Sequence, residues 1–303
     1  MDIRRKSLLY LILLALIWGG TYMLIRLADR TMTPLTFTMG RTIIGTIVLY
    51  VYLRSQGQVL PPIGRAWIPF GIMGIFAMLA PVLLIAYGEE SVSGGFAAVL
   101  LSTVPIITVV LAHFTISEHL STEKLIGVIL GLAGATIVVL PDLLGGIELG
   151  LMGVILLLIV AVLRAGTTVY ARADLAGVTP LVLTTGMSIV ATVVSIPLSF
   201  ALENPLALRP SAESLLAMVA SGVFCSAIAY NMFYWLVANR GATYASLVSA
   251  IRPVVAVLFS VVFMGTAMRW TTLAGMVVLV FCIAVMNGYF GHGREFGRGA
   301  HKA

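Results

Sequence analysis

Long apolar stretches separated by short polar segments run through the whole chain. Each stretch has about 20 residues, the number that an α-helix needs to cross the hydrocarbon core of a bilayer. The segments between them are too short to form a soluble domain, so the pattern predicts a single all-α integral membrane bundle. Ten spans are expected, at residues 7–27, 34–53, 66–87, 92–116, 121–140, 149–170, 180–201, 213–238, 242–264 and 270–290.

The composition agrees with this interpretation. Of the 303 residues, 60% are hydrophobic and only 10% are charged, which excludes an ordinary soluble globule. The net charge of +6 comes from basic residues scattered at the ends of the predicted spans, not from a basic face that could bind nucleic acid. The first apolar run continues to Leu27 without a small-residue cleavage site, so we interpret it as an uncleaved span rather than a signal peptide.

The lysines and arginines also predict an orientation, because cytoplasmic loops carry an excess of both. With the N-terminus in the cytoplasm, eleven of the eighteen fall on the cytoplasmic side, four fall on the opposite side and three lie within spans. We therefore expect both termini in the cytoplasm, with residues 292–303 as a disordered cytoplasmic tail.

The chain also contains an internal repeat. A shift of 148 residues aligns Gly74 with Gly222, Pro105 with Pro253 and Gly127 with Gly275, and a shift of 146 aligns Thr21 with Thr167 and Pro34 with Pro180. The order of spans and loops matches as well, which indicates a duplication. Because each half has an odd number of spans, five, the second half must be inverted relative to the first. We expect repeats at residues 1–145 and 146–291 around a central cavity, the architecture of alternating-access carriers.

These features resemble a known family. The segment Leu16-Ile17-Trp18-Gly19-Gly20-Thr21, the stretch from Pro34 to Arg41 and the paired helices with Pro105 and Pro253 are similar to those of EamA-type proteins of the drug/metabolite transporter superfamily. The likeness covers nearly the whole chain and is strongest to the YddG-type exporters of aromatic amino acids. It implies a transporter of the bacterial inner membrane. The family often closes its fourth and ninth spans with a Gly-Glu pair, where this chain has Ser117-Glu118 and Gly265-Thr266.

Arg252 is the deepest charge in the predicted spans. An ionisable residue at this depth is expensive and marks a functional site by default. Pro253 beside it removes a backbone donor, so we predict helix hinges at Pro253 and at its repeat counterpart Pro105. The guanidinium can bind a substrate carboxylate, with Ser249 one turn away, or it can satisfy carbonyls of its own bent helix. The matching segment Ser102-Thr103-Val104-Pro105 has valine in place of the arginine.

Two other arginines lie within spans, and the acids do not. Arg41 is expected to snorkel or to make a packing hydrogen bond, whereas Arg164 either lines the cavity or snorkels. All twelve acidic residues lie at span ends or in loops, and His113 lies near the end of a span. Because proton-coupled carriers usually hold an ionisable relay in the membrane, we predict a facilitator without proton coupling.

Aromatic side chains form the last group of candidates. Trp18 lies near mid-span, and Tyr230 and Tyr234 share a helix face because they are four residues apart. Tyr87 matches Trp235 in the repeat and Phe96 matches Tyr244, so both pairs could form gates or interfacial belts. The remaining predicted substrate-binding residues are Tyr22, Met78 and Asn231, although Met78 could also pack in the core.

Taken together, the sequence predicts a membrane transporter that exports aromatic and other neutral amino acids by alternating access. The alternative within the superfamily is a proton-coupled exporter of drugs or other small metabolites. We expect no enzymatic activity, no metal and no cofactor, because no nucleophile is paired with a base and no metal-ligand spacing occurs. Amino acids and the lipid bilayer are the expected partners. Small residues in the fifth span, Gly127, Gly131 and Ala135, support packing within a monomer or, alternatively, a homodimer face.

Overall fold

The computed structural model describes residues 3–89, 91–92, 97, 100–116, 122–144, 150–264 and 270–286. These residues form α1 (Ile3–Ala28), α2 (Pro34–Ser55), η1 (Arg65–Trp67), α3 (Ile68–Ile72), η2 (Met73–Leu79), α4 (Ala80–Glu89), α6 (Val104–Ile116) and α7 (Thr122–Leu144) in the first half. The second half contains α8 (Leu151–Ala173), α9 (Pro180–Leu202), η3 (Pro205–Ala207), α10 (Ala212–Ala220), η4 (Ser221–Ile228), α11 (Ala229–Arg240), α12 (Ala242–Ser246), α13 (Val248–Met264) and α14 (Trp270–Met286).

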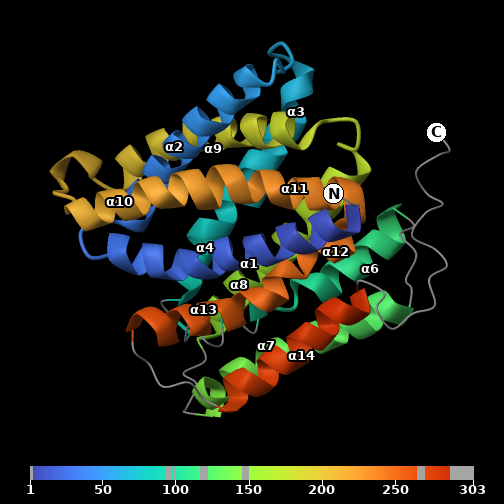
Figure 1. Ribbon diagram of the computed structural model, residues 1–303. Helices are drawn as coiled ribbons and strands as arrows, with labels where there is room; N and C mark the ends of the chain where they lie inside the picture. Colours follow the sequence, from blue (N-terminus) through green and yellow to red (C-terminus); the bar gives the residue numbers. More distant parts are fainter. Residues whose placement is uncertain are drawn as a thin grey trace.

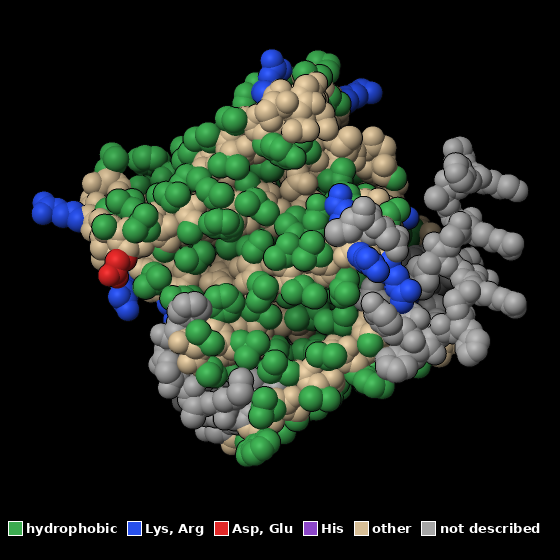
Figure 2. Space-filling model, viewed as in Figure 1, with side chains coloured by type: hydrophobic (Ala, Val, Ile, Leu, Met, Phe, Trp, Pro, Cys, Tyr) green, Lys and Arg blue, Asp and Glu red, His purple; other side chains and the backbone are tan. Residues whose placement is uncertain are grey.

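The prediction of an all-α integral membrane protein is confirmed. Within the described residues, seven helical stretches are long and apolar enough to cross a membrane, and three shorter apolar helices accompany them. The third, eighth and ninth predicted spans are each built from consecutive helical pieces, η1 to α4, α10 to α11, and α12 to α13. The face of the molecule in Figure 2 is mostly hydrophobic, with lysines and arginines toward its margins, as expected of a surface that contacts lipid.

The helices form a central group flanked by two peripheral pairs. Helices α2 and α9 lie together on one side of the bundle, and α7 and α14 lie together on the opposite side, with α1, α8, α11 and α13 between them (Figure 1). The α7–α14 pair packs closely because Gly127 and Gly131 leave room for Met286 and Cys282 of α14. These glycines therefore contact a helix of the same chain.

A π-helical turn occurs in each half at a matched position. The first is η2, which begins at Met73, and the second is η4, which begins 148 residues later at Ser221. A Cβ on Gly74 would lie 2.6 Å from the carbonyl oxygen of Met187, and a Cβ on Gly222 would lie 3.0 Å from that of Arg41. Arg41 and Met187 are themselves 146 residues apart, so the same close helix contact is made once in each repeat. Turns of this type interrupt the regular helix and occur often at functional sites.

Local sequence explains several helix ends. Pro34 and Pro180 each occupy the first turn of a helix, where the missing N–H of proline costs nothing. Gly241 separates α11 from α12 with a φ of 90°, a left-handed conformation that favours glycine. Glu203 at the end of α9 accepts hydrogen bonds from the backbone N–H groups of Leu35 (3.1 Å) and Thr36 (2.8 Å), which caps the start of α2 with a carboxylate.

Candidate functional site

A cavity of about 280 Å³ lies between the two halves. Residues of the first, third, fourth, sixth, eighth and ninth spans line it, and residues of α2 line it as well. The lining residues are Trp18, Thr21, Ile25, Asp29, Pro34, Phe37, Thr38, Arg41, Ala77, Val82, Ile85, Ala86, Val104, Arg164, Thr167, Thr168, Tyr230, Phe233, Tyr234, Ser246, Ser249 and Arg252.

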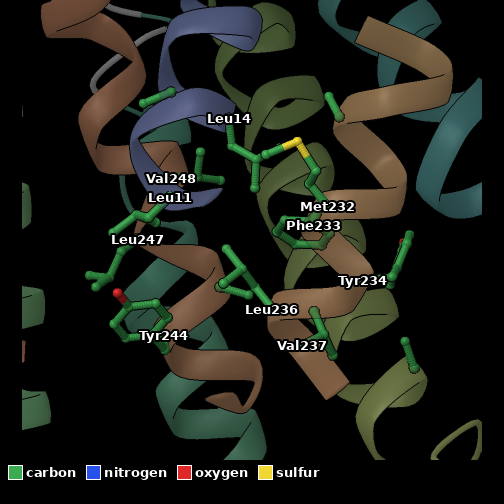
Figure 3. Close-up of a cluster of buried hydrophobic side chains, with 14 of the residues drawn as sticks. Leu11, Leu14, Met232, Phe233, Tyr234, Leu236, Val237, Tyr244, Leu247 and Val248 are labelled. Carbon is green, nitrogen blue, oxygen red and sulfur yellow. The ribbon is translucent and has the colours of Figure 1, made fainter. Parts of the chain in front are cut away.

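The cavity has an open end and a closed end. Asp29 and Pro34, where α1 ends and α2 begins, are the exposed members of the lining, so we call this end the mouth. The opposite end, the floor, lies toward the turn between α11 and α12. There an apolar plug formed by fully buried Leu11, Leu14, Leu236, Leu247 and Val248 fills the space between α1, α11 and α13 (Figure 3).

Charged and aromatic side chains support the plug on its far side. The Lys6 ammonium lies 4.6 Å from the ring centroid of Trp235, and the Arg240 guanidinium lies 4.3 Å from that of Tyr244. Trp235 also packs edge-on against Tyr10 at 4.9 Å. These contacts join α1 to α11 and α11 to α12 through cation–π attraction.

The centre of the cavity combines an aromatic cluster with a cation. Trp18 packs against Tyr230 and Phe233, with ring centroids 5.4 and 5.3 Å apart. The Arg252 guanidinium lies 5.8 Å from the centroid of Trp18. Tyr234 continues the aromatic surface by stacking on Tyr230 at 6.4 Å.

Two hydrogen bonds hold this cluster across the two halves. The Trp18 indole N–H donates to the carbonyl of Cys225 in η4 (3.2 Å), and the Tyr230 hydroxyl donates to the carbonyl of Ala77 in η2 (3.3 Å). Ala77 and Cys225 are repeat counterparts, 148 residues apart. Each half therefore supplies an aromatic donor to the π-helical turn of the other half, and such bonds fix ring positions because an unbonded N–H or O–H would be costly in an apolar interior.

The other two arginines within the spans also line the cavity. Arg41 is buried, with 7% of its surface exposed, and its Nε donates to the Ser226 hydroxyl at 3.1 Å. This hydrogen bond agrees with the packing role predicted for Arg41, and its burial excludes snorkelling. Arg164 is half-buried and lines the cavity, which was one of its two predicted placements.

Asp29 contributes the carboxylate of the cavity lining. It follows the last residue of α1 and keeps contact with solvent at the mouth. The surrounding protein still desolvates the carboxyl group in part, which raises the pKa of Asp29 above its ordinary value. In the described part of the chain, no group of three or more His, Cys, Asp or Glu side chains is arranged to hold a metal ion.

The lining is symmetric in position and asymmetric in chemistry. Repeat-related positions face the cavity in pairs, and the second-half member is the larger or more polar one in most of them. The pairs are Trp18 with Arg164, Thr21 with Thr167, Val82 with Tyr230, Ile85 with Phe233, Ala86 with Tyr234 and Val104 with Arg252. The second half thus supplies most of the groups that can recognise a ligand, and α4 and α6 supply a smooth apolar wall.

The structure brings together six of the predicted substrate-binding residues, and these are Trp18, Arg164, Tyr230, Tyr234, Ser249 and Arg252. The side chain of Tyr22 lies outside the described residues. Three others lie away from the cavity lining. Met78 is buried in the core with 3% exposure, Tyr87 is 53% exposed at the end of α4, and Asn231 is half-buried one helical step away from the Tyr230 face.

The two predicted hinges have different surroundings. Pro105 is the second residue of α6 and directly follows a break in the helix at Ser102 and Thr103. Pro253 lies inside the continuous helix α13, and the break in this span is at Leu247, between α12 and α13. A gap in helical structure therefore accompanies each proline, although in the second half it lies more than a turn before the proline.

The structure describes three of the four residues in the predicted gate pairs. Trp235 and Tyr244 belong to the contacts beside the plug, whereas the Trp235 counterpart Tyr87 is exposed. Phe96 lies outside the described residues, as do Glu118 and Gly265-Thr266 of the predicted family signature and the tail from residue 292.

The contribution of α2 to the cavity was not predicted from the sequence. Pro34, Phe37, Thr38 and Arg41 all line the cavity, and their spacing of i, i+3, i+4 and i+7 puts them on one helix face. The same spacing relates Tyr230, Phe233 and Tyr234, of which Phe233 was also missed. The i, i+3, i+4 and i+7 spacing that ends at Arg41 is the signal for the α2 residues, and Phe233 lies on the face already marked by Tyr230 and Tyr234.

The fold and the cavity define the class of protein, a multi-pass membrane protein with two repeats around a cavity large enough for a small ligand. The model of the EamA-like transporter family matches residues 5–140 and again residues 151–288. The chain belongs to the EamA-like transporter family, and it is accordingly a membrane transporter.

Individual relatives cover nearly the whole chain. It is 28% identical over 277 residues to the uncharacterized inner membrane transporter YedA of Escherichia coli, covering 90% of this chain and 88% of the relative. It is 22% identical over 284 residues to the uncharacterized transporter YoaV of Bacillus subtilis, covering 94% and 97%. A solved crystal structure superimposes with a TM-score of 0.79 at 21% identity, covering 93% of this chain and 96% of the other, which supports the fold.

Proposed function

We propose that this transporter exports amino acids, both aromatic and other neutral ones, by alternating access between its two repeats. The observation that carries the proposal is that Arg252 lines the same cavity as the aromatic cluster of Trp18, Tyr230 and Phe233. A guanidinium binds a carboxylate through two parallel hydrogen bonds, and the aromatic surfaces offer apolar contact for a substrate side chain. The resemblance to YddG-type exporters supports the same substrate class.

The proposed transport cycle uses residues 1–145 and 146–291 as the two moving halves. With both termini in the cytoplasm, as the basic residues favour, the mouth faces outward and the plug closes the cytoplasmic side. Rocking of the halves would separate the plug and close the mouth. We favour a monomer as the working unit over a homodimer, because Gly127 and Gly131, the small residues that could form a dimer face, pack against α14 of the same chain.

We further propose that transport runs down the substrate gradient without proton coupling. In the part of the chain that the structure describes, the lining includes a carboxylate only at the mouth, in Asp29, and the centre of the cavity is lined by arginines, hydroxyls and aromatic rings. Asp29 is at the same time the observation that favours the alternative, a proton-coupled exporter of drugs or other small metabolites, because its pKa is raised.

Transport by purified protein in liposomes separates these functions. Uptake of labelled phenylalanine, threonine and a cationic drug is measured with and without a pH gradient. We expect saturable exchange of both amino acids, no uptake of the drug and no accumulation driven by the gradient. Uphill transport driven by protons would contradict the facilitator, and transport of the drug alone would contradict the amino acid function.

Substitution of Arg252 tests the carboxylate site. We expect Arg252→Ala to raise the half-saturation concentration for phenylalanine roughly ten- to hundredfold, because a hydrogen bond to a charged group contributes about 1.5–3 kcal/mol. Arg252→Lys keeps the charge and should show a smaller loss. Arg209→Ala, in an exposed loop, serves as the control, and thermal unfolding in detergent verifies that each variant is folded. Unchanged affinity in a folded Arg252→Ala variant would exclude this role.

A further inference from the structure

Three hydroxyl groups near the floor of the cavity have a fixed orientation. Thr167 donates its proton to the carbonyl of Leu163 (2.7 Å), Thr168 donates to that of Arg164 (2.6 Å) and Ser246 donates to that of Thr243 (2.8 Å). A hydroxyl has one proton and two lone pairs. Because each proton is held by the helix that carries the residue, the oxygens can offer only lone pairs to a ligand in the cavity. The three side chains are therefore hydrogen-bond acceptors toward the substrate.

These acceptors lie on the floor side of the arginines. On α8, Thr167 and Thr168 follow Arg164 by three and four residues, which puts them on the same face about one turn, or roughly 5 Å, farther from the mouth. The ninth span runs in the opposite direction, so Ser246, which precedes Arg252, also lies on the floor side. Val169 of α8 packs in one cluster with Ala242 of α12, which confirms that these two segments are neighbours here.

The charges of the lining residues indicate which ligand group these acceptors would bind. Arg164 and Arg252 supply cationic donors. Among the described lining residues the carboxylate is that of Asp29, which lies at the mouth, eleven residues along the chain from Trp18. The groups near the arginines that can accept hydrogen bonds from a substrate ammonium are therefore neutral oxygens. Oxygens whose own protons are already bound suit this task, because they do not have to reorient before they accept from a charged donor.

We propose that Thr167, Thr168 and Ser246 form a subsite for the ammonium group of the substrate, on the floor side of an arginine layer that binds its carboxylate. The subsite selects molecules in which an ammonium and a carboxylate are adjacent, and it orients them with the ammonium toward the plug. This inference rests on the proposed amino acid function and deepens it, because it assigns a separate set of residues to the second charge of the zwitterion.

The test compares phenylalanine with 3-phenylpropionate, which has the same ring and carboxylate but no amine. Both are measured as labelled substrates with the purified protein in liposomes. Thr167→Val and Thr168→Val, singly and together, preserve side-chain shape and remove the acceptor oxygens, whereas Thr→Ser at both positions keeps them. The control is Thr185→Val, because Thr185 is fully buried in α9, makes the same bond to the carbonyl of Leu181 (2.7 Å) and lies outside the cavity.

We expect the wild-type protein to favour phenylalanine, and the double valine variant to raise the half-saturation concentration for phenylalanine about tenfold, the effect of losing a hydrogen bond to a charged group. The value for 3-phenylpropionate should change by less than about twofold, and the serine variants should resemble the wild type.

Other outcomes overturn one or both proposals. If both compounds are transported and the valine variants affect them equally or not at all, the ammonium subsite is wrong and the amino acid function stands. If the wild-type protein transports only 3-phenylpropionate, or neither compound, the amino acid function fails and the subsite fails with it. The amino acid function is decided by the wild-type protein alone, so a poorly folded variant does not affect that result.

Discussion

At the scale of single residues, the same position in the two repeats has different chemistry. Arg252 occupies the position of Val104, and Arg164 occupies that of Trp18. All four face one cavity, so the ligand environment changes from apolar on one side to cationic on the other. Exchange of a few side chains after duplication is enough to produce this asymmetry, because the helix contacts that shape the cavity are shared by both halves.

Asp29 gives a prediction about pH. Burial raises the pKa of Asp29, so its carboxyl binds a proton at a higher pH than the ordinary value of about 3.9. Acidification on the mouth side should therefore remove a negative charge that repels substrate carboxylates, and the half-saturation concentration for phenylalanine added on that side should fall about two- to threefold, the size of an exposed charge interaction.

The Asp29→Asn variant should show the lower half-saturation concentration for phenylalanine at every pH, because it lacks the titrating charge. Glu213→Gln is the matched control, since Glu213 is an exposed acid paired with Arg30 at 3.3 Å and does not line the cavity. A pH dependence that persists unchanged in Asp29→Asn would assign the effect to another group. The measurement is initial uptake into liposomes buffered separately inside and outside.

At the scale of helices, the π-helical turns η2 and η4 are two matched points of contact between the halves. Each packs against a peripheral helix of the opposite half, α9 or α2, and each offers a carbonyl to a cavity aromatic residue. These turns thus connect the shape of the cavity to the packing of the peripheral helices. Their glycines are needed because a fixed backbone atom of the neighbouring helix occupies the space of a side chain.

Alanine substitutions at these glycines should destabilise the protein. Gly74→Ala places a methyl group 2.6 Å from the Met187 carbonyl oxygen, and Gly222→Ala places one 2.7 Å from the Cβ of Ile44, so the helices must separate. Each change should cost about 1–3 kcal/mol, as overpacking does in other interiors. Gly166→Ala, with no neighbouring atom within 4 Å, should leave stability unchanged or slightly higher. Thermal unfolding in detergent measures all three, and equal melting temperatures would contradict the packing argument.

At the scale of the whole molecule, the cavity reaches one end of the bundle and the plug fills the other. The plug residues lie on the helices of the central cluster, α1, α11 and α13, or, for Leu247, directly before α13, so movement of these helices would alter the cavity and its closure together. Trp235 is packed beside the plug while its counterpart Tyr87 is exposed, a difference that fits either of the two predicted roles, a gate or an interfacial belt.

Cysteine labelling tests which side is accessible. A membrane-impermeant thiol reagent should modify Ile25→Cys, a half-buried position that lines the cavity one turn before Asp29, from the outer side. Leu247→Cys is fully buried in the plug. It should react from the cytoplasmic side at least about tenfold more slowly, because the state that exposes it is a minor population. The native Cys225 and Cys282 are buried and give little background. Rapid labelling of Leu247→Cys from the cytoplasmic side would contradict a closed floor.

The sequence by itself determined the membrane spans, the helical class and the duplication. Span length depends on the thickness of the bilayer, and matched residues such as Pro105 and Pro253 are recognisable without knowledge of their contacts. It also indicated Trp18, Tyr230 and Arg252 as candidates, because aromatic and charged groups at mid-span need partners inside the bundle.

Only the tertiary structure decided which face of each helix meets the cavity. It placed Arg41 and Phe233 in the lining, and it placed Met78 in the core and Asn231 off the lining face. In a soluble protein the apolar face of a helix is the buried one, but lipid is as apolar as a protein interior, so hydrophobicity does not distinguish the two sides of a membrane helix. Close packing between helices makes that choice, and packing depends on residues far apart in the chain.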